Sequence, residues 1–411
     1  MFLKNYILNE GYNKKFFLSG GLKSKIISKN KFYHDLSFGA GTLILGHQSE
    51  IYLKAISEIK KNYISSLASP NYQALKFAKL LNKIDNKQKK FIFCNSGTEA
   101  VTKSLRIIRA ITKKELIISV TGSWHGSVDK LLFQYNTNNE IKALSDGLTK
   151  NDKKNIKFIE YNNIKKSKSV LDRYKKKISC IIIEPIQGCL PSYDSLEYLK
   201  FLIEYSNDNK IIIIFDEIIS GLRVNSSNVQ KYIKKHADIT ILGKCFGGGF
   251  PIGIIALSEK ITKILESKKL NIFYGGTYSA NSLAMHIGYR TTQYILKNKN
   301  ILKNIEKKSI IFQNELNKYF LQFNIDAKVY RFFSILRIVF SKKNIKDRVQ
   351  RDFLEKKNYK KINQFKKYLL TKNIYYPSSG VIFFSDKTTF ANLKEITLSF
   401  KQAAYKILKK I

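Results

Sequence analysis

The chain has 411 residues and a formal net charge of +42, from 73 Lys and Arg against 31 Asp and Glu. Its length allows one large domain with a smaller one beside it, and its hydrophobic content of 44% is typical of a globular protein. No apolar run approaches the length of a membrane-spanning helix, and residues 1–6 predict no signal peptide. These features exclude a membrane-spanning protein and predict a cytoplasmic one.

Three explanations of the positive charge stay open. The lysines are spread along the chain, which favours a coding bias toward Lys, Asn and Ile. Attraction of an anionic substrate or cofactor and nucleic-acid binding are the alternatives, although no zinc-finger spacing or aromatic RNA-binding signature is present. The four cysteines lack a CxxC spacing, so no metal site or disulfide is predicted. Cys94 and Cys180 lie in apolar runs and are predicted to be buried.

The first hundred residues contain a candidate phosphate site. Residues 1–45 are polar and irregular, and helices are predicted over 51–59 and 72–84. A strand over 91–94 is followed at once by residues 95–100 (Asn-Ser-Gly-Thr-Glu-Ala) and a helix over 101–111. Such a strand, turn and helix start present free backbone N–H groups and the positive end of a helix, where a phosphate binds. An ordinary N-cap with Glu99 in the first turn is the alternative.

The next segments predict a parallel sheet. A strand over 116–120 leads to a loop with Trp124, the only tryptophan, whose ring suits a planar ligand; a core anchor is the alternative. Residues 136–179 carry little information. A strand over 181–183 ends in Glu184, and a helix is predicted over 197–206. Because the strands are apolar without alternation, we predict a mainly parallel sheet covered on both faces.

The most informative stretch runs from residue 210 to residue 251. A strand over 211–215 ends in Asp216 and Glu217, and a strand over 239–242 leads to Lys244 between glycines. An acid at the end of one strand and a lysine just past the next face the same ligand edge of an open α/β sheet. This arrangement suits a lysine that forms an imine with pyridoxal phosphate and an acid that keeps the pyridine nitrogen protonated. On this stretch alone, a solvated surface lysine is the alternative.

The remainder of the chain predicts a second domain. A loop of small residues over 275–281 precedes a helix over 282–295, and Lys-rich helices then alternate with short strands over 335–340 and 381–384. We interpret residues 46–290 as a large cofactor-binding domain. Residues 291–411 would form a C-terminal small domain, to which an N-terminal segment over 1–45 contributes.

Taken in order, these segments resemble the class III aminotransferases, which are pyridoxal-phosphate (PLP) enzymes of fold type I. The resemblance spans about residues 32–385. The segments that carry it are 95–100 (NSGTEA), 124–126 (WHG), 183–188 (IEPIQG), 215–217 (FDE) with 221–224 (GLRV), 242–244 (LGK) with 247–253 (GGGFPIG), and 276–281 (GTYSAN). Within this family, the motif sequences are most similar to those of the glutamate-1-semialdehyde aminomutase branch. The resemblance implies an α/β fold with a mainly parallel, seven-stranded sheet between helices and a smaller α+β domain.

The resemblance also implies roles for individual residues. Lys244 would form the Schiff base and move the proton, and Asp216 would pair with the pyridinium nitrogen. Ile218 and Trp124 would pack on opposite faces of the cofactor ring. The implied phosphate ligands are Gly97, Thr98 and, from the neighbouring subunit of a homodimer, Thr277.

Departures from the family pattern affect the substrate side. Cys189 stands where family members carry Glu or Asn, a Glu expected within 377–385 is missing, and so is an Arg shortly after Ser24. For Arg337 a structural ion pair is favoured, with a contact to a substrate carboxylate as the alternative. We predict an aminotransferase that moves an amino group between an amino donor and a carbonyl-containing small-molecule acceptor. The alternatives are glutamate-1-semialdehyde 2,1-aminomutase, an isomerase of tetrapyrrole biosynthesis, and, more distantly, a basic nucleic-acid-binding protein on this fold.

Overall fold

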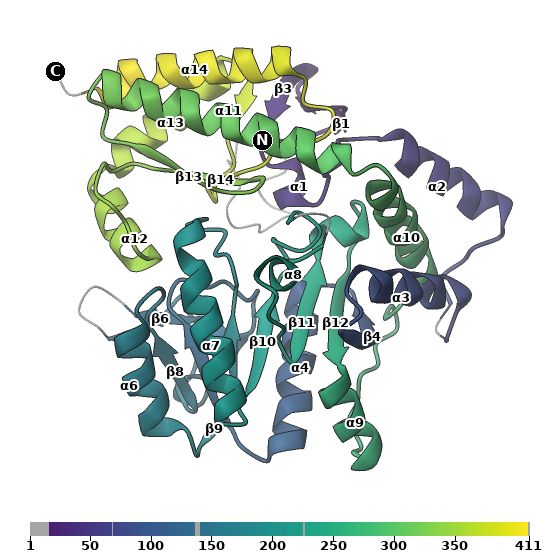
Figure 1. Ribbon diagram of the computed structural model, residues 1–411. Helices are drawn as coiled ribbons and strands as arrows, with labels where there is room; N and C mark the ends of the chain where they lie inside the picture. Colours follow the sequence, from purple (N-terminus) through teal and green to yellow (C-terminus); the bar gives the residue numbers. More distant parts are fainter. Residues whose placement is uncertain (1–15, 68, 136–139, 225–226, 410–411) are drawn as a thin grey trace.

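A computed structural model describes residues 16–67, 69–135, 140–224 and 227–409 of the chain (Figure 1). The first six residues, on which the prediction of no signal peptide rests, lie outside this part. Among the described helices, none combines the length and the apolar character that a membrane crossing requires.

A seven-stranded sheet organises the larger layer of the molecule. In spatial order its strands are β4 (Gln88–Cys94), β12 (Gly253–Ser258), β11 (Ile239–Gly243), β10 (Ile212–Asp216), β9 (Ile178–Ile183), β5 (Leu116–Val120) and β8 (Ile156–Ile159). The five strands from β11 to β8 run parallel, whereas β12 is antiparallel to both of its neighbours. The predicted mainly parallel sheet is thus confirmed.

Helices cover both faces of this sheet, which explains why its strands are apolar throughout. In β10, Ile212 and Ile214 pack in the core with α4 (Gly97–Thr112), and α9 (Glu259–Ser267) shares that core. Ile213 and Phe215 pack in the core on the other face. The helices of that face are α6 (Ile164–Tyr174), α7 (Leu196–Asp208) and α8 (Val229–Ile233). At the β4 edge, α2 (Glu50–Lys61) and α3 (Tyr72–Ile84) pack against α10 (Ser282–Lys297) (Figure 1).

The C-terminal part forms a second layer above the sheet (Figure 1). Its helices are α11 (Asn300–Gln322), α12 (Arg348–Lys357), α13 (Tyr359–Thr371) and α14 (Phe390–Leu408). An antiparallel sheet of β13 (Lys328–Phe332), β14 (Ile335–Val339) and β16 (Val381–Ile382) packs with them. The domain boundaries at residues 45 and 290 stay a prediction.

Two segments contain more structure than the sequence predicted. Residues 20–35, expected to be irregular, form β1 (Gly20–Leu22), β2 (Lys25–Ser28) and β3 (Lys31–Asp35). β3 pairs with β15 (Ile374–Tyr375), so a partner more than 300 residues away completes this sheet, and no local pattern reveals it. In the uninformative stretch 136–179, the described residues form β7 (Ile141–Ala143), α5 (Lys150–Lys153), β8 and α6. The remaining short elements are α1 (Phe38–Gly41), β6 (Phe133–Tyr135) and three 3₁₀ helices over Asp129–Leu131, Tyr193–Ser195 and Lys244–Gly247.

Candidate active site

The residues predicted to carry chemistry meet at one edge of the seven-stranded sheet. Asp216 ends β10, Lys244 follows β11, Glu184 follows β9, and Trp124 lies in the loop after β5. The carboxyl ends of parallel strands lie side by side, and ligands of open α/β sheets bind there. Hydrogen bonds join these loops. The backbone N–H of Trp124 donates to Glu184 Oε1 at 2.7 Å, and His125 Nδ1 lies 2.8 Å from Asp216 Oδ2.

Lys244 has an unusual backbone and an unpaired amine. Its φ is +44°, in the left-handed region that costs a non-glycine residue about 1–3 kcal/mol and is concentrated at functional sites. Within the described residues its amine makes no hydrogen bond or ion pair. Removal from water lowers the pKa of Lys244, while the nearby carboxylates of Asp216 and Glu184 oppose the shift. More of this amine is therefore neutral, and nucleophilic, than for an exposed lysine.

Asp216 and His125 form a buried pair beside this lysine. Their side chains are 3% and 1% exposed, and the Ile218 N–H also donates to Asp216 Oδ1 at 3.2 Å. An ionised aspartate only accepts hydrogen bonds, so Nδ1 of His125 carries the proton that joins the pair. The other ring nitrogen, Nε2, is buried without a partner among the described residues. A buried nitrogen of this kind is a candidate ligand contact.

Glu217, the second carboxylate of the predicted pair, does not belong to the site. It accepts hydrogen bonds from the Ser220 hydroxyl at 3.0 Å, the Val229 N–H at 2.8 Å and the Gln230 amide at 3.1 Å. These bonds tie the turn after β10 to α8. Its role is to fix the chain that follows Asp216.

Glu184 instead joins two loops of the site. Its carboxylate accepts hydrogen bonds from the N–H groups of Trp124, at 2.7 Å, and Gly188, at 3.3 Å. Burial raises the pKa of Glu184 to about 7, and the negative charge of Asp216 adds to the shift while His125 opposes it. This carboxyl is therefore neutral below about pH 7 and becomes charged as the pH rises.

The fluorescence of Trp124 is expected to report this ionisation. Because Trp124 is the only tryptophan and its backbone N–H, next to the indole side chain, donates to Glu184, emission should change with an inflection near pH 7. In Glu184→Gln the inflection should be lost, since an amide does not titrate. Glu160→Gln, whose carboxylate binds Lys166 and Asn163, is the control and should keep it. An unchanged inflection in Glu184→Gln would assign the titration to another group.

Two backbone N–H groups at the start of α4 have no hydrogen-bond acceptor among the described residues. Ser96 caps the helix, because its hydroxyl accepts from the Glu99 N–H and its carbonyl from the Ala100 N–H, both at 3.1 Å. The N–H groups of Gly97 and Thr98 have no acceptor among the described residues. A Cβ on Gly97 would overlap Cδ1 of Ile218, so a side chain at this position would require the tip of Ile218 to move. Ser96 is therefore an N-cap, as the alternative interpretation expected, and the N–H groups of Gly97 and Thr98 are still free to bind a phosphate.

Ile218 and Trp124 lie beside the site in different environments. Ile218 is half-buried between Gly97 and Gly243. The Trp124 side chain is 50% exposed, so the core-anchor interpretation is wrong.

Thr277 is exposed on the surface loop before α10. The loop is held by hydrogen bonds from Lys103 to the Ser279 hydroxyl, at 3.4 Å, and from Asn71 to the Ala280 carbonyl, at 2.9 Å. Among the described contacts, none joins Thr277 to Lys244 or Thr98 within one chain.

The two substrate-side residues left open by the sequence, Arg337 and Cys189, both contact α12. Arg337 pairs with Glu355 at 3.3 Å and donates to the Ser379 carbonyl, as the favoured interpretation predicts. The Cys189 thiol lies 3.3 Å from the Gly122 carbonyl, and its own carbonyl accepts a hydrogen bond from Arg351 of α12 at 2.6 Å.

Three residues of the site received no role from the sequence: His125, Glu184 and Arg223. Arg223 is buried, donates to the Gly41 carbonyl at 2.7 Å, and its positive charge contributes to lowering the pKa of Lys244. Glu184 carries the same signal as Asp216, an acid just past an apolar strand. No local pattern distinguishes His125 or Arg223, because their partners lie on distant segments.

Comparison with known proteins identifies relatives of this arrangement. The family model of the class-III aminotransferases matches residues 26–329. Glutamate-1-semialdehyde 2,1-aminomutase of Methanococcus vannielii is 34% identical over 319 residues, which cover 76% of this chain and 73% of the relative. The fold is similar to that of an omega-transaminase from Sphaerobacter thermophilus, with a TM-score of 0.85, 19% identity, and 95% and 91% of the two chains covered. A transaminase with PLP bound has a TM-score of 0.83 at 22% identity, covering 96% of this chain and 91% of its own.

Proposed function

We propose that this chain, which belongs to the class-III aminotransferase family of PLP-dependent enzymes, moves an amino group between an amino donor and a carbonyl-containing small molecule. The observation that carries the proposal is the unpaired, desolvated amine of Lys244, which lies close to the carboxylates of Asp216 and Glu184. Membership of the family supports an enzyme that acts on small amino and carbonyl compounds. The identity of donor and acceptor depends on residues outside the shared motifs.

The groups left without partners fit the cofactor. The Lys244 amine suits its aldehyde, and the free N–H groups of Gly97 and Thr98 at a helix start suit its phosphate. Asp216, held by His125, would keep the ring nitrogen protonated. Ile218 and the half-exposed Trp124 would cover the two ring faces.

In this proposal Lys244, Asp216 and His125 divide the chemistry with the cofactor. When bound, PLP supplies an electron sink that stabilises negative charge on the substrate carbon. Lys244 would hold the cofactor, and its amine would take up and return the proton at the substrate carbon. Its lowered pKa increases the share of the neutral amine, which is the form that accepts a proton. Asp216 would hold positive charge at the ring nitrogen, and the His125 hydrogen bond orients the Asp216 carboxylate for this role.

Donor and acceptor experiments test this function. Protein loaded with PLP and given an amino donor without acceptor should release no more than one keto product per subunit. Addition of a carbonyl acceptor should then restore turnover. Release of keto product in excess of the subunits without any acceptor would contradict a two-stage amino transfer.

A homodimer with shared sites is part of the proposal. Tyr72, Phe273 and Tyr278 are between 61% and 79% exposed. The Asn71–Ala280 bond, and a bond from Arg106 to the Phe273 carbonyl at 2.9 Å, hold their segments to the large domain. Such exposed aromatic side chains are typical of an interface. A second copy on this face would place its Thr277 at the neighbouring phosphate site.

Thr277→Ala is expected to weaken PLP binding about tenfold, the loss of one hydrogen bond to a charged group, without changing the mass of the dimer. Cofactor titration and light scattering measure the two effects. Mixing this variant with Lys244→Ala supplies the sharper test, because one site of the mixed dimer then has both residues intact. At a PLP concentration too low to load Thr277→Ala, activity should rise on mixing, because the intact site of the mixed dimer binds PLP with unchanged affinity. Mixed dimers that need as much PLP as Thr277→Ala does would show that each chain completes its own site.

The aminomutase is the second candidate function, favoured by the 34% identity with the M. vannielii enzyme. Against it stand Cys189 and the absence of Glu within 377–385, positions at which the resemblance leads us to expect substrate-side groups. An aminomutase isomerises its substrate without a separate amino donor. Conversion of glutamate-1-semialdehyde at full rate in the absence of any donor would favour this candidate.

A further inference from the structure

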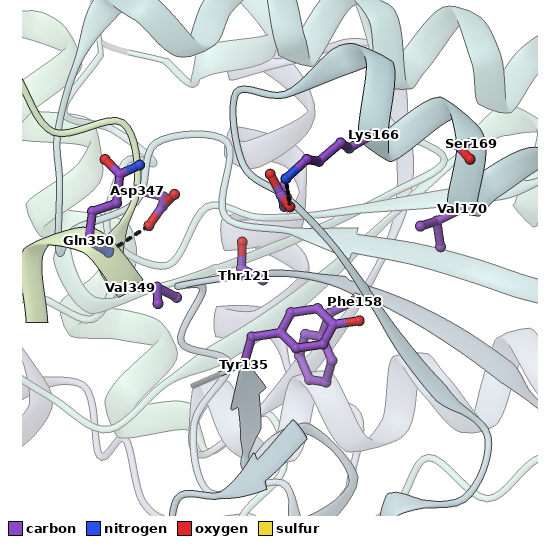
Figure 2. Close-up of a pocket in the computed structure, with 10 residues that line it drawn as sticks. Thr121, Tyr135, Phe158, Lys166, Ser169, Val170, Asp347, Val349 and Gln350 are labelled. Carbon is purple, nitrogen blue, oxygen red and sulfur yellow. Dashed lines mark hydrogen bonds and ion pairs between the residues drawn. The ribbon is translucent and has the colours of Figure 1, made fainter. Parts of the chain in front are cut away.

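A hollow lies where the carboxyl ends of β5 and β8 meet α6 and the start of α12 (Figure 2). Its volume of about 500 Å³ is in the range of small-molecule sites, and such sites are common between domains. Its walls come from the ends of β5, β6 and β8, from α6, and from the start of α12. None of the roles assigned above uses this hollow.

One wall of the hollow is apolar and contains an aromatic ring. Tyr135 packs against Phe158 with ring centroids 5.7 Å apart and an angle of 65° between the planes. Val170 of α6 and Val349 of α12 extend this surface (Figure 2). Aromatic and aliphatic walls of this kind cover the C–H faces of a ring-shaped ligand.

The start of α12 contributes hydrogen-bonding groups with unused capacity. Asp347 Oδ1 accepts from the Gln350 N–H at 2.9 Å, and Gln350 Oε1 accepts from the Lys346 N–H at 3.1 Å. Within the described residues this leaves Asp347 Oδ2 as a free acceptor and the Gln350 amide N–H groups as free donors. Alternating donors and acceptors match hydroxyl groups, which need both.

The hollow differs in charge from the rest of this cationic chain. Lys166 forms an ion pair with Glu160 at 2.8 Å, and Glu160 also accepts from the Asn163 amide at 2.9 Å (Figure 2). Asp347 lies close enough to Lys166 for their charges to interact. The lining side chains therefore present two carboxylates and one ammonium group, a poor match for a phosphate or another anion. A neutral, hydroxylated ligand fits these groups better.

The position of the hollow connects it to the catalytic edge. Thr121, which lines it, lies three residues before Trp124, and its carbonyl accepts a hydrogen bond from Gln187 at 2.8 Å. β5 is two strands away from β10, so Thr121 is about 10 Å from Asp216 along the sheet edge, at about 4.8 Å per strand. A ligand that occupied both places would have to span about this distance, which is longer than a simple amino acid.

We propose that this hollow binds the hydroxylated, sugar-like portion of an extended acceptor whose carbonyl group reacts at Lys244. This inference deepens the proposed aminotransferase function and rests on it. It names the acceptor class as a polyhydroxylated carbonyl compound. Tyr135 would cover one face of the ligand, and Asp347 and Gln350 would bind its hydroxyl groups.

Binding is tested first, without any catalytic step. Methyl glycosides and inositol lack a free carbonyl group, so they bind without reacting. Saturation-transfer NMR on the ligand should detect binding to the PLP-loaded protein, and Gln350→Leu and Tyr135→Leu should each weaken it about tenfold. Gln364→Leu, at an exposed position of α13, is the matched control and should bind as the unchanged protein does. Absence of binding by every probe, or equal binding by all three variants, would overturn the assignment.

Turnover then tests the link to the reaction. Hydroxylated aldehydes should be better acceptors than deoxy aldehydes of the same length. Gln350→Leu should reduce kcat/KM for the hydroxylated series about tenfold and leave the deoxy series unchanged. Loss of both series equally would contradict a role in recognising hydroxyl groups. If glycosides bind but no acceptor turns over, the aminotransferase function fails. If simple acceptors turn over but glycosides do not bind, only the hollow is misassigned.

Discussion

Lys244→Ala is expected to reduce amino transfer by at least about 10³-fold, since positioned acid–base groups contribute 10²–10⁴-fold and Lys244 also holds the cofactor. Folding should be little affected, because the substitution removes an amine that is desolvated and has no partner among the described residues. Steady-state kinetics with excess PLP and a thermal unfolding curve measure the two effects.

Lys269→Ala is the matched control for this substitution. Lys269 has the same φ of +44° but is exposed, on the segment that precedes the Thr277 loop. Its replacement removes the same side chain from the same backbone conformation without touching the site, so activity should be unchanged. Residual activity of Lys244→Ala within tenfold of the unchanged protein would show that another group holds the cofactor and moves the proton.

Asp216→Asn is expected to lower kcat by at least about 10²-fold, because an amide carries no charge to hold a protonated ring nitrogen. The side chain keeps its size and an acceptor oxygen for His125 but loses its charge, so stability should also fall, by about 1 kcal/mol, because hydrogen bonds to charged groups are the stronger ones. The visible spectrum of the PLP-loaded variant should differ from that of the unchanged protein, which a purely structural role would not produce.

Asp238→Asn separates stability from chemistry. Asp238 is also buried, accepts a hydrogen bond from the Ile213 N–H at 3.0 Å and pairs with Lys260 at 2.9 Å, but it precedes β11 at the opposite edge of the sheet. We expect a comparable loss of stability with normal kcat and a normal spectrum. Equal losses of kcat in Asp216→Asn and Asp238→Asn would show that Asp216 acts only through the stability of the fold.

The parallel sheet and its ligand edge could be predicted from local patterns. The uninterrupted apolar runs that became β5, β9, β10 and β11 are buried on both faces, and such strands leave little ambiguity. Acids and glycines at strand ends then indicated where Asp216 and Lys244 would lie. Both signals can be read from a few consecutive residues, without knowledge of distant contacts.

The parts that could not be predicted depend on contacts between distant segments. β3 is completed by β15, about 340 residues later, and its own sequence is too polar to indicate a strand. His125 pairs with Asp216 across 91 residues, and Arg223 binds Gly41 across 182. The ion pair of Arg337 with Glu355 likewise requires α12 to fold over β14. The hydrogen-bonding groups of the hollow, Asp347 and Gln350, also lie at the start of α12.

The central claim, that Lys244 holds PLP, is tested most directly by borohydride trapping. Purified protein should bind PLP with a visible absorption band that bleaches on addition of glutamate or another amino donor. Reduction before the donor is added should fix the cofactor covalently, and peptide mass spectrometry should locate it on Lys244. A protein without the band, or an adduct spread over other lysines and equal in Lys244→Ala, would contradict the assignment.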